Sequence, residues 1–442
     1  RSFGELGLHA NCVRALREVF AYDEMTEVQS RVLPSLLEAS SNQSDAIIRA
    51  KAGTGKTLTY LIPAVEHIVR RPPLGVGALV VAPSRELVLQ IAREADMLCA
   101  YHALQVVPLI GGVRRDRDEA MIRKRRPAIL VGTPGRLIEH LESTFRFQTL
   151  FGTLEKLVLD ECDELLQAQA EAVGMLLDYL PPQDRRQTLL VSATIPAEVR
   201  DLASRICRPG YGVLDCVGAG HPTPDTAEQL YAVCPGLLLY IALRNAVSEE
   251  ALGNPAGHKV IVFFPTARLA AFSAQLFRDQ LQMPVREIHA RCDGAARMVT
   301  QHEFNESSSG VLFTSGVSER GLDYPDVSLV VQVLAPVSRE HYIHRVGRTA
   351  RAGKSGRSLL LLLDREEQAG FLGCVGDLPL ARHPGEALLL HDGGALTGGA
   401  VSSARWMPDG SLFRAASAAF ASVLKHYQVT QTAVSLGADG AA

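Results

Sequence analysis

The stretch that decides the fold is Ile47–Val69, IIRAKAGTGKTLTYLIPAVEHIV. It opens with an apolar run, continues through a glycine-rich loop and ends in a segment of helical character. A strand, a loop and a helix N-terminus in this order form a cradle for phosphate, because glycines let backbone N–H groups approach an anion that the helix dipole also favours. The stretch therefore predicts an open α/β sheet that binds a phosphorylated ligand.

The loop supplies the groups that such a cradle needs. Lys56 adds positive charge, and Thr57 offers a hydroxyl that can ligate Mg²⁺. The strict motif has glycine where Ala50 stands, but A-x-x-G-x-G-K-T between a strand and a helix is still specific. We expect the phosphates to contact Ala52, Gly53, Thr54, Gly55, Lys56 and Thr57.

Short apolar runs recur on both sides of this stretch, with helical segments between them. Runs that are apolar throughout are what a parallel sheet covered on both faces requires. On this pattern we predict strands at 46–48, 78–81, 128–131, 156–159, 188–191, 259–264, 285–288, 310–314, 328–333 and 358–363. The pattern predicts two tandem doubly wound parallel-sheet domains, and a faint likeness between 79–87 and 260–269 indicates duplication.

Proline and glycine mark the boundary between the two halves. The segment 208–224 is dense in residues that resist regular structure, so we assign 1–216 to a first domain, 217–227 to a linker and 228–370 to a second domain. The residues from 371 to 442 contain a glycine-rich loop at 391–399 and an apolar helical face at 411–427. We expect a short helical C-terminal extension that packs on the second domain.

Composition narrows the function classes. The 442 residues are 47% apolar and 21% charged, which excludes disorder, and the net charge of −3 means that any nucleic-acid surface is a local patch. The eight cysteines include no C-x-x-C pair, which favours reduced thiols over zinc ligands or disulfides. No apolar run approaches the roughly 20 residues that cross a bilayer. We expect no membrane partner and no obligate homo-oligomer.

Four carboxylates and a thiol follow another buried run, in Val158–Leu166, VLDECDELL. Asp160 ends a predicted strand of the sheet that carries the phosphate loop, so we expect it to hold Mg²⁺. Glu161 beside it would polarise the water that attacks the terminal phosphate. Cys162 lacks a partner cysteine or a nearby histidine and is predicted to be a bystander. The alternative, solvated acids at a helix start, suits Glu164.

These motifs, in their order, resemble those of DEAD-box RNA helicases, in a variant with Asp-Glu-Cys-Asp at 160–163. The first half also has PSREL at 83–87, Gly-Gly at 111–112, TPGR at 133–136 and SAT at 192–194. The second half has FFPT at 263–266, SGVSERGLD at 315–323 and HRVGRTAR at 344–351. The resemblance implies two RecA-like domains, an RNA-dependent ATPase and helicase activity, and ATP and Mg²⁺ as cofactors.

The resemblance also gives roles to residues of the ATP site. Tyr22 and Gln29 match the adenine-reading motif, and Asp323 is placed to accept hydrogen bonds from the ribose hydroxyls. Arg348 and Arg351, three apart on a helix start, would act as arginine fingers on the phosphates. The remaining catalytic and coupling residues implied are His344, Asp163, Ser192 and Thr194.

RNA is the partner that the resemblance implies, held through its sugar–phosphate backbone. Such contacts position a nucleic acid but do not read its sequence, so we expect structured or duplex RNA without sequence preference. The basic run 114–126 is either a solvated helix face or an auxiliary RNA contact. The implied contact residues are Pro83, Ser84, Arg85, Gly111, Gly112, Thr133, Pro134, Gly135, Arg136, Ser315 and Arg320.

Two questions of function stay open in the sequence. Gly316 stands where the family usually has aspartate, which weakens the expected coupling and favours an alternative, an ATP-dependent RNA clamp with little turnover. A DNA translocase is disfavoured, because the motifs resemble the RNA-specific group. The stretch 25–29 and the C-terminal helix are similar to those of mitochondrial DEAD-box RNA chaperones, which suggests mitochondrial ribosome assembly; a nucleolar or cytoplasmic location is the alternative.

Overall fold

The computed structural model describes residues 1–37, 44–51, 53–218, 220–316, 324–351, 353–364, 370–385 and 419. The chain divides into two compact units, Arg1–Pro222 and Thr223–Ala442, so the boundary falls inside the segment predicted as a linker. All eight cysteines are free thiols. None of the described helices has the length and apolar character that crossing a membrane requires.

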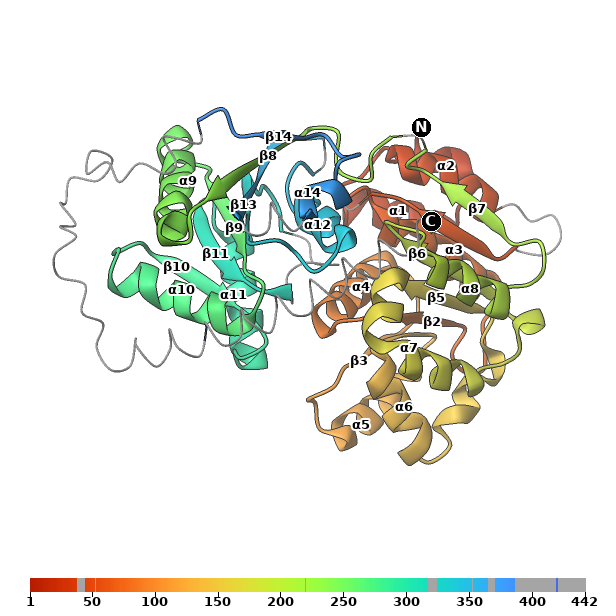
Figure 1. The fold of residues 1–442 in the computed structure, drawn as a ribbon. Helices are drawn as coiled ribbons and strands as arrows, with labels where there is room; N and C mark the ends of the chain where they lie inside the picture. The colour runs from red at the N-terminus through yellow and green to blue at the C-terminus, as the bar shows by residue number, and fades with distance from the viewer. Residues whose placement is uncertain are drawn as a thin grey trace. The chain divides into compact units, whose positions relative to one another are not determined.

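The first unit is built on a seven-stranded sheet with the order β3-β4-β2-β5-β6-β1-β7, and every pairing in it is parallel (Figure 1). A parallel sheet needs a crossover between successive strands, and here helices supply it. The strands are β1 (Ala46–Arg49), β2 (Ala78–Val81), β3 (Val106–Leu109), β4 (Ile129–Gly132), β5 (Lys156–Asp160), β6 (Gln187–Ser192) and β7 (Gly212–Asp215).

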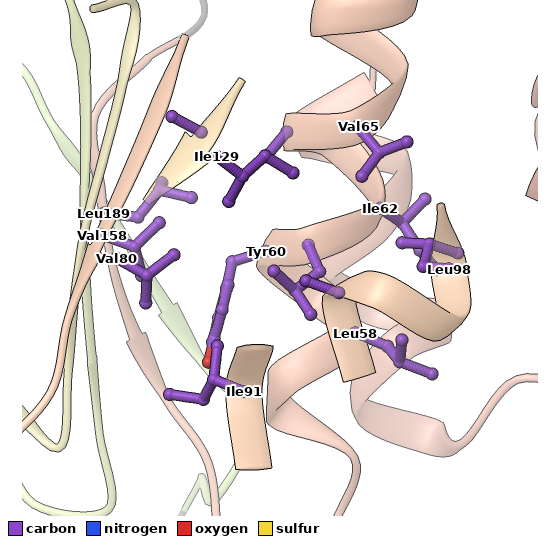
Figure 2. Packing of buried hydrophobic residues seen from close by; sticks show 14 of the residues in the cluster. Leu58, Tyr60, Ile62, Val65, Val80, Ile91, Leu98, Ile129, Val158 and Leu189 are labelled. Atoms are coloured by element: carbon purple, nitrogen blue, oxygen red, sulfur yellow. The ribbon is translucent and has the colours of Figure 1, made fainter. Parts of the chain in front are cut away.

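Helices cover both faces of this sheet because successive strand residues point to opposite sides. Val80 of β2 packs toward α3 and α4 in one core cluster, whereas its neighbour Leu79 belongs to the cluster beneath α6, α7 and α8. Figure 2 shows the first cluster, where Tyr60 of α3 lies next to Val80 of the sheet and Ile62 lies next to Leu98 of α4. The helices are α1 (Ala10–Glu18), α2 (Glu27–Leu37), α3 (Lys56–Arg70), α4 (Arg85–Leu98), α5 (Arg115–Arg125), α6 (Pro134–Ser143), α7 (Cys162–Asp178) and α8 (Ala197–Ile206), with 3₁₀ turns η1 (Phe3–Leu6), η2 (Phe147–Thr153) and η3 (Gln183–Arg185).

The second unit repeats the plan with a seven-stranded parallel sheet of order β10-β11-β9-β12-β13-β8-β14. Its strands are β8 (Ala227–Cys234), β9 (Lys259–Phe263), β10 (Val285–Ile288), β11 (Gly310–Thr314), β12 (Leu329–Val333), β13 (Gly356–Leu363) and β14 (Leu380–Arg382). Its helices are α9 (Leu239–Gly253), α10 (Ala267–Asp279), α11 (Gly294–Glu306), α12 (Arg339–Val346) and α14 (Phe371–Cys374), with η4 (Gly236–Leu238). Helices α9 and α10 cover one face, and α11, α12 and α14 cover the other.

The fold class predicted from the sequence is confirmed, since each of the ten predicted runs overlaps a strand. Four strands were missed. β3 contains Pro108, which a sheet tolerates only at an edge, and β3 is an edge strand. β14 falls in the segment assigned to the extension, yet it pairs with β8 and completes the second sheet. The predicted helix at 411–427 lies outside the described residues except for Ala419, which is helical and buried in the core of the second unit.

Candidate active site

The glycine-rich loop connects β1 to α3 as the sequence predicts. Gly53 and Gly55 have φ angles of +72° and +83°, in the left-handed region that glycine enters at little cost. Gly55 is also sterically required, because a Cβ there would lie 2.6 Å from Nε2 of Gln29. Ala52 lies outside the described residues.

Gln29 is buried and holds this loop in place. Its Oε1 accepts a hydrogen bond from the Thr26 N–H at 2.9 Å, and its Nε2 donates to the Gly55 carbonyl at 3.2 Å. The Thr26 hydroxyl donates to the Thr54 carbonyl at 2.8 Å. The motif assigned to adenine recognition therefore positions the phosphate loop, a role that the sequence pattern does not reveal. Tyr22, assigned to base stacking, is 50% exposed.

The carboxylates predicted to act on ATP meet the loop lysine in a buried cluster at the end of β5. Nζ of Lys56 lies 3.3 Å from Oε1 of Glu161. Asp160 accepts a hydrogen bond from the Tyr60 hydroxyl at 2.7 Å and another from the Glu161 N–H at 2.9 Å. Tyr60 is a site residue that sequence reasoning missed, although its place four residues after Lys56 puts it on the same face of α3.

The electrostatics of the cluster favour a cation. Burial, together with the neighbouring charge of Glu161, raises the pKa of Asp160 to about 6, while Lys56 and the Tyr60 hydrogen bond act in the opposite direction. The positive charge of Lys56 therefore acts on both buried carboxylates. The Asp160 carboxylate and the Thr57 hydroxyl are oxygen donors of the kind that Mg²⁺ prefers, so the residues present fit this ion.

The last two residues of the Asp-Glu-Cys-Asp segment differ in their surroundings: Cys162 lies in the apolar core, and Asp163 contacts Thr194. Cys162 is fully buried in the apolar cluster under α7 and α8, and this burial raises the pKa of its thiol, which agrees with the bystander role. Asp163 accepts a hydrogen bond from the Thr194 hydroxyl at 2.6 Å, and the Thr194 N–H donates to Oγ of Ser192 at 3.3 Å. The three residues assigned to coupling are thus brought together.

The loops assigned to RNA contact follow β2, β3 and β4 in the first unit. The Arg85 guanidinium lies on the Gly111–Gly112 backbone so closely that a Cβ at Gly112, which has a φ of +83°, would be 2.6 Å from Nη1. Ser84 caps α4 by accepting from the Leu87 N–H at 3.2 Å. Thr133, Pro134 and Gly135 open α6, with no atom within 4 Å of a Cβ added at Gly135.

Arg136 differs from the expectation of direct RNA contact. Its side chain is 4% exposed and forms an ion pair with the buried Asp118 at 2.8 Å. It also pairs with Glu139 at 2.7 Å and donates to the Val113 carbonyl at 2.8 Å. A guanidinium engaged in this way positions the Gly111–Val113 loop, because it joins that loop to α5 and α6.

Helix α7 connects the carboxylates to the first of these loops. It begins at Cys162, directly after Glu161, whose φ is +48°. At Gln169 the backbone leaves helical geometry (φ −144°, ψ 30°), and the Gln169 amide donates to the Pro83 carbonyl at 2.9 Å. One helix therefore connects the predicted catalytic carboxylates with a loop assigned to RNA contact.

In the second unit the predicted arginines follow α12 rather than begin a helix, which corrects the sequence expectation. α12 ends at Val346, and Arg348 and Arg351 lie in the turn beyond it. Arg348 Nε donates to the His344 carbonyl at 3.2 Å, and Arg351 Nε donates to the Gly347 carbonyl at 2.9 Å. His344 and Ser315 are buried. Arg320 and Asp323 lie outside the described residues.

Comparison with known families agrees with this geometry. The model of the DEAD/DEAH box helicases matches residues 26–202, and that of the helicase conserved C-terminal domain matches residues 243–353. The DEAD-box ATP-dependent RNA helicase 26 of Oryza sativa subsp. japonica is 39% identical over 374 residues, which are 84% of this chain and 68% of that protein. The chain belongs to the DEAD-box helicase family.

Other DEAD-box relatives are longer than this chain. It is 38% identical over 392 residues to the DEAD-box ATP-dependent RNA helicase 26 of Arabidopsis thaliana. The aligned residues are 86% of this chain but 45% of that protein. Among solved structures, Mss116p bound to ssRNA and AMP-PNP superposes with a TM-score of 0.78 at 28% identity, covering 88% of this chain and 80% of that one. Mss116 bound to ssRNA and UDP-BeF gives a TM-score of 0.79 at 25% identity, with coverage of 98% and 90%.

Proposed function

We propose that this chain is an RNA-dependent ATPase that uses ATP hydrolysis to unwind or remodel structured RNA locally. The observation that carries the proposal is the buried cluster of Lys56, Asp160 and Glu161 beside the glycine loop. The family names of its relatives, and the ssRNA and AMP-PNP bound by a structural neighbour, support the choice of substrate.

The geometry gives each group a task in hydrolysis. The N–H groups at the start of α3 and the Lys56 ammonium bind the phosphates. Because Lys56 lies 3.3 Å from Glu161, its pairing with phosphate leaves the Glu161 carboxylate to accept the proton of the attacking water. Burial of the cluster excludes bulk water, which strengthens each of these interactions.

Mg²⁺ completes the proposed site. Thr57 and Asp160 would hold it, and the ion would supply positive charge against the phosphates. Tyr60 keeps the Asp160 carboxylate oriented through the 2.7 Å hydrogen bond. Arg348 and Arg351 are proposed to add positive charge at the phosphates during hydrolysis.

RNA-stimulated turnover tests the proposal. Purified protein is expected to hydrolyse Mg-ATP faster when single-stranded RNA is added and to separate a short RNA duplex. Lys56→Ala is expected to remove both activities, because it takes away the charge that binds the phosphates. The proposal would be overturned if RNA did not change the rate of ATP hydrolysis, or if the Lys56→Ala protein still separated the duplex.

Gly316 favours a second candidate, an ATP-dependent RNA clamp with little turnover. Glycine in this exposed position, directly after the buried Ser315, offers no carboxylate to couple RNA contact to hydrolysis. RNA release timed before and after ATP hydrolysis separates the two functions, because a clamp releases RNA slowly in both states whereas a helicase releases it quickly once ATP is hydrolysed.

We also propose a mitochondrial location with ribosomal or intron RNA as target, on the strength of the resemblance at residues 25–29 and in the C-terminal segment. Cell fractionation of the full-length protein tests the location. Sequencing of RNA crosslinked to it in cells tests the target, and a predominance of cytoplasmic or nucleolar RNA would replace this proposal.

A further inference from the structure

Helix α5 is polar on nearly all sides and ends in a run of basic residues. Only Asp118 and Ile122 of this 11-residue helix are buried. Its apolar contacts are limited to Ile122 and Met121, and the buried pair of Asp118 with Arg136, together with the 3.2 Å contact of Asp118 with His140, fixes it to α6. The remaining residues of the helix face solvent in whole or in part.

The charge on that surface is unevenly distributed. Residues 114–126 contain seven Lys or Arg and three acids, 7 − 3 = +4, in a chain whose net charge is −3. All three acids are engaged in the N-terminal two-thirds of the segment: Asp116 with Arg114 at 2.6 Å, Glu119 with Arg115 at 3.4 Å, and Asp118 with Arg136.

The basic residues at the end of α5 are exposed and uncompensated. Across the described ranges, which include all of 53–218, Arg123, Lys124 and Arg126 form no ion pair. A lysine or arginine at a helix C-terminus gains a little from the dipole, but that effect does not require three exposed charges together. Their density favours an anionic partner.

An exposed aromatic ring lies near the middle of α5. The Thr144 hydroxyl donates to Oε1 of Glu119 at 3.1 Å, which brings the next residue, Phe145, near a point one helical turn before Arg123. The Phe145 ring is 87% exposed, and the Arg146 guanidinium lies 5.2 Å from its centroid. Figure 1 shows α5 and α6 next to each other at one end of the first unit. We call Arg123, Lys124, Arg126, Phe145 and Arg146 the α5 patch.

We propose that the α5 patch is a second RNA-binding surface, which holds single-stranded RNA beyond the segment bound by the family motifs; this inference rests on the proposed function. Basic side chains would contact phosphates, and Phe145 would stack on a base, the combination that single-stranded nucleic acid requires. Neither contact reads sequence.

The patch is separate from the motif loops. Those loops follow the carboxyl ends of β2, β3 and β4, and α5 runs back from that edge toward the start of β4. Its 11 residues span ~16 Å at 1.5 Å each. Only RNA longer than the motif segment can therefore reach both surfaces, and this length dependence makes the proposal testable.

The experiment compares two charge-reversal variants of the whole chain. Arg123→Glu with Lys124→Glu alters the patch, and Arg200→Glu with Arg205→Glu makes the same change of charge on exposed residues of α8. Affinity is measured by fluorescence anisotropy with a non-hydrolysable ATP analogue, for single-stranded RNAs of about 8 and about 30 nucleotides, since binding grooves cover roughly 4–16 nucleotides. Each titration is repeated over a range of salt concentrations.

The patch variant is expected to bind the long RNA about tenfold more weakly, with a salt slope reduced by about 1.4, since each phosphate contact contributes about 0.7. Its affinity for the short RNA, and both affinities of the α8 control, are expected to match the wild type. Phe145→Ala is expected to weaken long-RNA binding about fivefold with the salt slope unchanged, because stacking releases no counterions.

Equal long-RNA affinities for the patch variant and the α8 control overturn the proposal and leave an acidic protein surface as the occupant. An equal loss for short and long RNA also overturns it, because the residues would then belong to the motif segment. Failure of the unaltered protein to bind either RNA contradicts the proposed function itself, which keeps the two failures distinct.

Discussion

The two units build the same sheet and put different chemistry on it. β5 and β12 both occupy the fourth place in their sheets. Each is followed by a residue in the left-handed region, Glu161 with φ +48° and Leu334 with φ +67°. The backbone makes the same turn, but one side chain is a carboxylate and the other is a buried apolar group.

The loops after β1 and β8, which also occupy equivalent places, differ in the same way. β1 leads into the glycine loop and Lys56, whereas β8 leads through Pro235 and η4 into α9. The sheet depends on the apolar runs, which both units share, and the chemistry depends on the few residues that follow the strands. A change in one unit and its counterpart in the other should therefore have different effects.

The largest expected effect is on turnover. Glu161→Gln removes the base, so RNA-stimulated ATP hydrolysis should fall about 10²- to 10⁴-fold, while binding of ATP to the loop persists. Leu334→Met, at the equivalent turn of the second sheet, should keep the wild-type rate because it preserves apolar volume. A steady-state ATPase assay and a nucleotide-binding titration measure both; a Glu161→Gln rate within a few-fold of wild type would refute the assignment.

Next in size is the buried ion pair of α5. Arg136→Met leaves the Asp118 carboxylate buried beside His140 alone, and should cost about 3–5 kcal/mol of unfolding free energy. Arg339→Met breaks the exposed pair with Asp377 in the second unit and should cost about 0–1 kcal/mol. Urea unfolding compares them. Adding Asp118→Leu to Arg136→Met should restore part of the loss; similar costs for the two single variants would contradict the burial argument.

A smaller effect is expected from the Tyr60 hydroxyl, which should orient the Asp160 carboxylate as well as stabilise the fold. Tyr60→Phe removes the hydroxyl that donates to Asp160, a hydrogen bond to a charged group that contributes about 1.5–3 kcal/mol, and should raise the Mg²⁺ concentration needed for half-maximal ATPase activity. Tyr342→Phe removes a buried hydroxyl that donates to Gln229 in the second unit at 3.1 Å. It should lower stability alone. Identical Mg²⁺ curves for Tyr60→Phe and wild type would exclude the proposed role.

The smallest effect concerns a buried lysine. Burial lowers the pKa of Lys156 from 10.5 to about 7. Between these values the unfolded chain binds a proton that the folded protein does not, so this residue makes stability rise with pH, by at most ~1.4 kcal/mol per unit. Lys156→Met should remove that rise above pH 7, and replacing the exposed Lys354 should not. Unfolding titrations from pH 7 to 9 that show the same slope for all three proteins would rule this out.

The sequence predicts the elements that carry a repeated apolar pattern. It does not predict features that depend on a single contact between distant residues. Apolar runs predicted ten strands, nine of which are buried along almost their whole length; the tenth, β10, is an edge strand with half-buried Arg286 and Glu287. β7 was missed because its residues are half-buried or exposed, and β8 because Glu228 and Gln229 interrupt its apolar character. Strands at or near sheet edges carry little of the continuous hydrophobic signal.

The site, like the fold, could be predicted in part from the sequence. The glycine loop, Asp160 and Glu161 follow strands directly, so their order along the chain implies their proximity. Tyr60 and the buried state of Arg136 depend on partners 100 and 18 residues away in sequence, and no local pattern reports such pairings. The arginines were placed on a helix start because the chain pattern does not reveal that α12 ends at Val346.

The break in α7 at Gln169 has a mechanical consequence. A continuous helix would carry any displacement at its first turn along its whole length, whereas a jointed one concentrates it at the joint. That joint is hydrogen-bonded to Pro83 at 2.9 Å. A displacement of the Glu161 turn would therefore act on the loop before α4, so the first unit alone contains a mechanical connection between the proposed ATP site and a loop assigned to RNA contact.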